Sequence, residues 1–156
     1  MQYIFINNRH KNSNNLIIYY KIKNCLFDKK TILITGGTGF LGKALTRKLL
    51  ETDVSVIRIF SREEFKQIEM KSEFSDNRLR FLIGDIRDKD RISDALKDVD
   101  IVLHTAALKH VPIAEYNPFE AVKTNVNGAQ NVIDGCLDND VETALAIGTD
   151  KAVSPL

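Results

Sequence analysis

Cysteine is scarce in this sequence of 156 residues. The chain has two cysteines, Cys25 and Cys136, which lie far apart and lack the close spacing of metal ligands. Few and isolated thiols are typical of a reducing compartment. We therefore assign neither a disulfide nor a metal site.

Long apolar runs are also missing. The most apolar early segment, Leu16–Tyr20, is followed at once by Lys21 and Lys23, and it falls far short of the ~18–20 apolar residues that a membrane helix needs. The polar run Asn7–Asn12 interrupts any apolar core of a secretion signal. These absences predict a cytoplasmic protein with no membrane segment.

An excess of basic charge is absent from most of the chain. Residues 1–30 hold six Lys and Arg against one acidic residue, whereas residues 31–156 hold sixteen against twenty. A nucleic-acid-binding surface needs clustered basic residues to neutralise phosphates. The mild acidity of residues 31–156 therefore argues against a nucleic-acid partner.

Strand and helix patterns alternate from Lys30 onward, which is typical of βαβ units on a parallel sheet. The sequence therefore predicts an α/β fold with a Rossmann-type, doubly wound parallel sheet in residues 28–156, truncated after about the fifth strand. The expected strands are Thr31–Thr35, Val54–Phe60, Leu79–Ile83, Ile101–His104 and Ala144–Ile147. The expected helices are Lys43–Leu50, Glu63 to about Glu73, a helix capped by Asp88 that runs through Leu96, and one from Pro118 to about Cys136.

Residues 1–27 differ in kind from the rest, being rich in asparagine and in basic residues. We interpret them as a poorly ordered extension outside the domain. Tyr19 and Tyr20, after Ile17 and Ile18, also favour a first strand or hairpin, and that alternative stays open.

A glycine pattern, Gly36-x-x-Gly39-x-x-Gly42, joins the first expected strand to the first helix. In a dinucleotide fold the first glycine permits a tight turn, the second lets backbone approach a pyrophosphate, and the third lets helix and strand pack closely. The anion then lies at the positive end of the helix. A glycine-rich turn without a ligand is the alternative, which the strand–turn–helix context disfavours.

The residues after the second and third strands bear on the choice of dinucleotide. Ser61-Arg62 stands where a carboxylate favours NAD and a basic residue favours the 2′-phosphate of NADP, and Arg62 can bind phosphate and stack on adenine. Asp85-Ile86 suits the adenine, through the Asp85 carboxylate and the apolar Ile86. The alternatives are a solvated surface arginine and a plain turn aspartate. We expect NADP.

Beyond these features, residues 30–155 resemble the extended short-chain dehydrogenase/reductase superfamily. Within it they resemble the CapD-like polysaccharide-biosynthesis group and its inverting UDP-N-acetylglucosamine 4,6-dehydratases. The block after the fourth strand is the most specific match to this group. The motifs that carry the resemblance are Ile34–Gly39, Phe60–Arg62, Gly84–Asp88, Ala106–Pro118, Lys123–Ala129 and Thr149–Ala152.

The resemblance implies a redox-neutral lyase. In that group NADP⁺ oxidises C4 of UDP-N-acetylglucosamine, water is lost across C5–C6, the hydride returns to C6, and C5 is reprotonated on the opposite face. It implies a nucleotide-sugar partner, a homo-oligomer for the full-length enzyme, and a product for polysaccharide or flagellin glycan. Related epimerases and retaining dehydratases are the alternative enzymes.

The resemblance also implies site residues. Thr149 would hydrogen-bond the reacting C4 oxygen, and Asp150 and Lys151 would serve as acid and base. A lysine can act as a base only when its pKa is lowered by burial or a neighbouring cation, and outside this family context the three would be an ordinary surface tripeptide. The expected cofactor-binding residues are Gly36, Thr38, Gly39, Phe40, Leu41, Gly42, Ser61, Arg62, Lys66, Asp85, Ile86, Ala106, Ala107, Lys109 and Asn125, with Asn125 bonding to backbone.

The chain departs from the group's pattern in three places. It ends before the position of the superfamily's Tyr-x-x-x-Lys pair, it has Gly148 where the group has serine, and it has Phe40-Leu41 where close relatives carry serine and phenylalanine. The sequence therefore predicts an inactive N-terminal portion of such an enzyme. A fragment that binds NADP without turnover is the second hypothesis.

Overall fold

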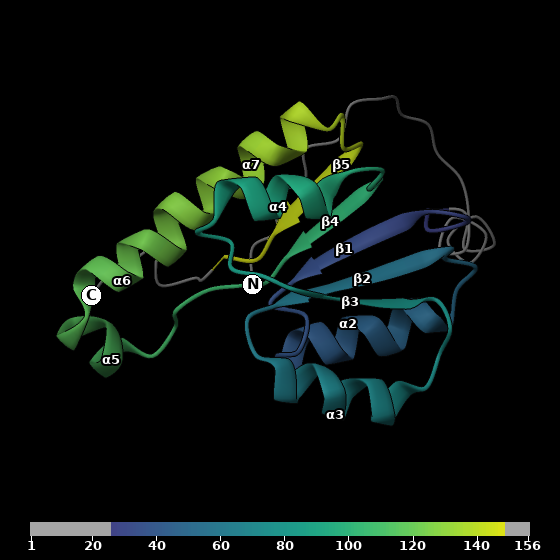
Figure 1. Ribbon diagram of the computed structural model, residues 1–156, viewed down its shortest axis with the longest axis horizontal. Helices are drawn as coiled ribbons and strands as arrows, with labels where there is room; N and C mark the ends of the chain where they lie inside the picture. Colours follow the sequence, from purple (N-terminus) through teal and green to yellow (C-terminus); the bar gives the residue numbers. More distant parts are fainter. Residues whose placement is uncertain (1–25, 149–156) are drawn as a thin grey trace, which may run out of the picture.

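The computed structural model describes residues 26–148. Figure 1 shows one sheet with helices on both faces, in the order strand, helix, strand that the sequence predicts. The strands are β1 (Thr31–Thr35), β2 (Val56–Ser61), β3 (Leu79–Ile83), β4 (Ile101–His104) and β5 (Thr143–Ala146). The helices are α2 (Phe40–Leu50), α3 (Glu64–Phe74), α4 (Lys89–Leu96), α5 (Val111–Tyr116), α6 (Pro118–Val122), the π-helix η1 (Lys123–Gly128) and α7 (Ala129–Asp138).

The five strands are parallel and lie in the order β3-β2-β1-β4-β5. The chain therefore moves outward from β1 to β3 and then crosses to β4 on the other side of β1. In open parallel sheets a ligand site lies at this point of reversal, beyond the carboxyl ends of the strands. The topology thus predicts a site above the ends of β1 and β4.

The core has two layers because neighbouring side chains of a strand face opposite sides of the sheet. Ile32 and Ile34 of β1 pack on the side of α2 and α3, and Leu33 between them packs on the side of α4 and α7. All three are fully buried. Burial on both faces explains why the central strands β1 and β4 are mainly apolar without polar alternation.

Several predicted boundaries are confirmed. β1, β3 and β4 have the predicted limits, and the Asp88 carboxylate accepts a hydrogen bond from Arg91 N at 3.0 Å, which caps α4. β2 begins two residues later than predicted and β5 one residue earlier. α3 begins one residue later than predicted, and α2 begins at Phe40 rather than Lys43, because its first turn lies inside the glycine pattern, where apolar periodicity gives no signal.

The predicted helix from Pro118 to about Cys136 is present, but it is not an α-helix along its whole length. The segment is helical from Pro118 to Asp138, but the six residues of η1 at its centre have π-helical hydrogen bonding. π segments are rare and often occur at functional sites. The sequence also gave no sign of the short helix α5.

The predicted extension is described only at its end. Residues 1–25 lie outside the described residues, and Cys25 with them. Phe27 packs against the core on the α2 and α3 side, so packing begins one residue before the predicted boundary at 28.

The Cys136 thiol is buried, which raises its pKa to about 11. No helix between residues 26 and 148 has the length and apolar character to cross a membrane.

Candidate dinucleotide site

The glycine turn after β1 is shaped by close backbone contacts. Gly36 has a φ of +64°, in the left-handed region that favours glycine, and its carbonyl accepts a hydrogen bond from Gly39 N at 2.9 Å. A Cβ on Gly36 would lie 2.9 Å from the backbone of Ala106, and one on Gly42 would collide with the backbone of Gly37. The turn and the first turn of α2 therefore need glycine at both positions.

The N-terminus of α2 opens directly above this turn. Its N-cap residue is Gly39, which has no side chain to satisfy the first N–H groups of the helix, and the first turn of α2 carries no acidic residue. Free N–H groups and the helix dipole both favour an anion at this position. The turn can therefore bind a phosphate group.

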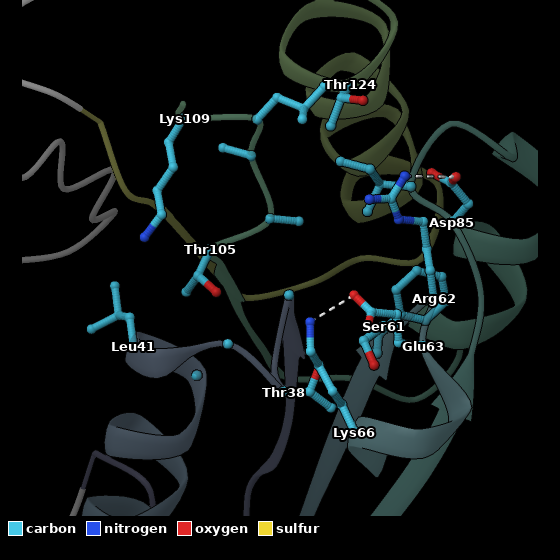
Figure 2. Close-up of a pocket in the computed structure, with 18 of the residues that line it drawn as sticks. Thr38, Leu41, Ser61, Arg62, Glu63, Lys66, Asp85, Thr105, Lys109 and Thr124 are labelled. Carbon is cyan, nitrogen blue, oxygen red and sulfur yellow. Dashed lines mark hydrogen bonds and ion pairs between the residues drawn. The ribbon is translucent and has the colours of Figure 1, made fainter. Parts of the chain in front are cut away.

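A cavity of about 260 Å³ lies at this end of the sheet. Figure 2 shows that residues from separate parts of the sequence surround it, with Leu41 and Lys109 on one side and Arg62 and Asp85 on the other. Every residue expected at the cofactor lines this cavity except Asn125. The lining set is Gly36, Thr38, Gly39, Phe40, Leu41, Gly42, Ser61, Arg62, Lys66, Asp85, Ile86, Ala106, Ala107 and Lys109.

Arg62 and Asp85 face each other across one end of the cavity (Figure 2). Arg62 Nη1 lies 3.7 Å from Asp85 Oδ2, and more than half of the Arg62 side chain is exposed. Burial would raise the pKa of the Asp85 carboxyl, but hydrogen bonds from Arg87 and the charges of Arg87 and Arg62 outweigh it and hold this pKa below its usual range. Asp85 is therefore a carboxylate, flanked by two guanidinium groups.

The strand end at Ser61 is held by a residue that the sequence did not single out. Gln67 of α3 is buried, and its Nε2 donates to the Ser61 hydroxyl at 3.0 Å and to the Leu82 carbonyl at 2.9 Å. Lys66, beside it, donates to Glu63 at 2.8 Å and is half exposed. Gln67 thus fixes the end of β2, whereas Lys66 is held only by a surface ion pair.

Asn125 of η1 supports another wall of the cavity. Its side chain makes two hydrogen bonds with the backbone of Leu108, one to the N–H and one to the carbonyl, each at 2.8 Å. Leu108 lines the cavity beside Ala107 and Lys109. Asn125 therefore acts on the cavity through the backbone, and contact with a cofactor stays a prediction.

Thr124 is a lining residue that the sequence analysis missed. It is buried, and among the described residues its hydroxyl has no hydrogen-bond partner. A buried hydroxyl without a partner is costly, so a ligand in the cavity is the natural partner. Its position next to Asn125 was the only signal in the sequence, because the π-helical geometry of η1 cannot be read from apolar spacing.

The ends of β1 and β4 are joined below the cavity by buried hydroxyl groups. The Thr35 hydroxyl accepts from Thr105 N at 3.2 Å and lies 2.7 Å from His104 Nδ1. Because the hydroxyl oxygen already accepts, its hydrogen is available to donate to Nδ1, which requires a neutral imidazole with its proton on Nε2. Burial lowers the pKa of His104, in agreement with this arrangement.

The half-buried His104 makes the stability of the fold depend on pH. An unfolded histidine takes up a proton below about pH 6.5, whereas the folded chain keeps His104 neutral, so the unfolded state gains protons and stability falls as the pH drops. We expect the free energy of unfolding to be lower at pH 5 than at pH 7.5, and His104→Asn to reduce that difference. Urea denaturation at both pH values measures it, and equal pH dependence in both chains would contradict the assignment.

The three residues expected to be catalytic, Thr149, Asp150 and Lys151, lie outside the described residues. The last described strand, β5, ends at Ala146, where it pairs with His104 of β4. In the sequence the three therefore follow a strand that ends at the same edge of the sheet as the cavity. Their catalytic roles stay predictions.

Comparison with known proteins agrees with this site. The family model described as polysaccharide biosynthesis protein matches residues 32–156. A UDP-N-acetylglucosamine 4,6-dehydratase (inverting) of Campylobacter jejuni is 56% identical over 132 residues, which cover 84% of this chain and 40% of the relative. A UDP-glucose 4-epimerase of Rickettsia bellii is 46% identical over 135 residues, with the same coverage of 84% and 40%.

Solved structures show the same fold. Pen from Bacillus thuringiensis is 45% identical and superposes with a TM-score of 0.81, over 83% of this chain and 40% of that protein. The dTDP-glucose 4,6-dehydratase DesIV from Streptomyces venezuelae, solved with NAD bound, is 29% identical with a TM-score of 0.66, over 72% of this chain and 37% of that one. The chain thus spans about 40% of the length of the curated relatives it matches.

The chain is therefore similar in sequence and fold to sugar-nucleotide dehydratases and epimerases. The family model covers most of the chain, and the first of these relatives is identical at more than half of the aligned positions. The chain belongs to the polysaccharide biosynthesis protein family, within the extended short-chain dehydrogenase/reductases.

Proposed function

We propose that this chain is the NADP-binding portion of a C5-inverting UDP-N-acetylglucosamine 4,6-dehydratase. The observation that carries the proposal is the 56% identity to the Campylobacter jejuni dehydratase, ten percentage points above the Rickettsia bellii epimerase over nearly the same residues. The cavity at the carboxyl ends of β1 and β4 supports the dinucleotide part of the proposal.

The residues present fit a dinucleotide phosphate. Gly36 permits the tight turn, Gly39 lets backbone approach the pyrophosphate, Gly42 lets α2 pack closely on the turn, and the uncapped N-terminus of α2 supplies N–H groups. Arg62 stands at the end of β2, where a 2′-phosphate would lie, and its half-exposed guanidinium can turn toward one. When bound, the nicotinamide would take a hydride from the sugar and later return it.

Around that cofactor the chain's own residues would bind and orient. Thr124 lines the cavity, and its buried hydroxyl, which has no partner among the described residues, could hydrogen-bond a ligand after a rotation of the side chain. Asn125 keeps the backbone of Leu108 in place beside it. We propose that Thr149 hydrogen-bonds the reacting oxygen of the sugar, with Asp150 as acid and Lys151 as base.

The test begins with binding and continues to turnover. Calorimetric titration of the purified chain with NADP⁺ should give saturable one-to-one binding. UDP-N-acetylglucosamine is then added with NADP⁺, and the product is followed by ¹H NMR, which distinguishes a 4-keto-6-deoxy sugar through its C6 methyl signal. Formation of that methyl signal supports the whole proposal, whereas binding without any product would restrict it to cofactor binding.

A second candidate is a sugar-nucleotide 4-epimerase, which the identity to the Rickettsia bellii enzyme supports. The same NMR experiment separates the two, because an epimerase inverts C4 and leaves the C6 hydroxymethyl group intact. A new equatorial C4 proton signal without a methyl signal would replace the dehydratase by this candidate. Absence of any nucleotide binding would overturn both.

A further inference from the structure

Arg87 lies just outside the cavity, yet it makes the strongest contacts to one of its lining residues. It follows β3 in the turn Gly84–Asp88, and its Nε and Nη2 donate to Asp85 Oδ2 at 2.8 and 2.7 Å. Its backbone N–H donates to the other carboxylate oxygen, Oδ1, at 3.0 Å. Both oxygens of Asp85 are therefore engaged by one residue, in charge-assisted hydrogen bonds of short length.

Arg62 contacts the same carboxylate far less closely. Its Nη1 is 3.7 Å from Asp85 Oδ2, beyond hydrogen-bond distance, and within residues 26–148 this is its single ion pair. The Arg62 side chain is 56% exposed and that of Arg87 is 33% exposed. Arg87 is thus the principal counter-ion of Asp85, and Arg62 is held less tightly.

Arg87 is itself held in place from the opposite wall. Its Nη1 donates to Glu120 of α6, and its carbonyl accepts from Asn131 Nδ2 of α7 at 3.2 Å. Asn131 also donates to the Ile86 carbonyl at 3.0 Å. These contacts fix the guanidinium plane of Arg87 against Asp85, which a freely rotating side chain would not achieve.

We propose that Arg87 is a positioning residue that sets the preference for NADP over NAD by keeping Asp85 away from Arg62. The inference rests on the proposed NADP binding. Without Arg87, the Asp85 carboxylate would form a direct pair with the nearby Arg62 guanidinium, which would then be unavailable to a 2′-phosphate. The uncompensated Asp85 charge would also repel that phosphate. NAD lacks the phosphate and would lose neither interaction.

The preference is measured as the ratio of the NAD⁺ to the NADP⁺ dissociation constant, by calorimetry on the purified chain. Arg87→Gln should lower this ratio about tenfold, which corresponds to one charge-assisted hydrogen bond. The double variant D85N/R87Q should restore the ratio, because no carboxylate remains to capture Arg62. Arg87→Lys keeps the charge without the two-pronged hydrogen bonding and should give an intermediate ratio.

A purely structural role for Arg87 would give a different result. It would weaken both nucleotides equally and leave the ratio unchanged, and that outcome overturns the inference, as does failure of D85N/R87Q to restore the ratio. Lys89→Gln is the matched control: it removes a positive charge two residues away that pairs with Asp134 rather than Asp85, so its ratio should stay that of the unaltered chain.

Failure of the proposed function has its own signature. If the unaltered chain binds neither nucleotide, or binds both equally, the proposed NADP site is overturned and this inference with it. If Arg87→Gln does not fold, as judged by circular dichroism and thermal melting, Arg87→Lys and D85N/R87Q still decide the inference. A ratio for Arg87→Lys equal to that of the unaltered chain would then overturn it.

Discussion

Replacing Gly42 by alanine should reduce NADP⁺ affinity by up to about a hundredfold. The added Cβ would collide with the carbonyl oxygen, carbonyl carbon and Cα of Gly37. These are backbone atoms and cannot move aside like the end of a flexible side chain, so the first turn of α2 must shift away from the glycine turn. Such overpacking costs about 1–3 kcal/mol, and each 1.4 kcal/mol lost from binding is about tenfold in affinity.

Calorimetric titration with NADP⁺ measures the loss for Gly42→Ala, and thermal melting shows whether the variant is folded. Gly148→Ala is the matched control for stability, because a Cβ at Gly148 would meet no atom of the described residues within 4 Å. Its melting temperature should equal that of the unaltered chain. Unchanged NADP⁺ affinity in a folded Gly42→Ala chain would show that the dinucleotide does not use this turn.

Replacing Arg62 by alanine should weaken NADP⁺ by about ten- to a hundredfold and leave NAD⁺ nearly unchanged. Hydrogen bonds to charged groups contribute about 1.5–3 kcal/mol, which corresponds to that range of affinities. The half-exposed Arg62 has one ion pair within residues 26–148, the 3.7 Å pair with Asp85. Its loss should therefore cost phosphate binding and little folding stability.

The control for Arg62→Ala is Arg80→Ala. Arg80 stands on β3 near its start, at the end of the sheet away from the cavity, and donates to the carbonyls of Asn77 and Leu79. Removing it takes away the same charge without touching the proposed site, so both nucleotides should bind as they do to the unaltered chain. Equal weakening of NADP⁺ and NAD⁺ by Arg62→Ala would contradict a role at the 2′-phosphate.

Local patterns predicted much of the sheet. β1 and β4 are short runs of β-branched and aliphatic residues buried on both faces, and such runs are recognisable without knowing their neighbours. Asp88 was recognised as a cap because capping depends on residues three positions apart. By contrast, η1 and α5 were missed, since a π-helical register and a six-residue helix leave no periodic signal.

The expected cofactor residues were predicted for a similar reason. The glycine turn and the residues just after β2, β3 and β4 all follow parallel strands, and the carboxyl ends of such strands meet at one edge. Gln67, Thr124 and Arg87 were not predicted at the site. Each of them contacts elements that are distant in the chain. Gln67 of α3 hydrogen-bonds both β2 and β3, Thr124 reaches the cavity from η1, and Arg87 links the turn after β3 to α6.

The sequence by itself determined the glycine turn, the alternation of strands and helices and the family, because each depends on residues close together along the chain. The tertiary structure decided which groups share a charge. Asp85 was expected to face adenine, but in the folded chain it is held by Arg87, and Arg62 is left half exposed beside it. The Asp85–Arg87 pair is local, but the distance from Arg62 to Asp85 and the contact of Arg87 with Glu120 join residues far apart in the chain, and only the packing of the elements fixes them.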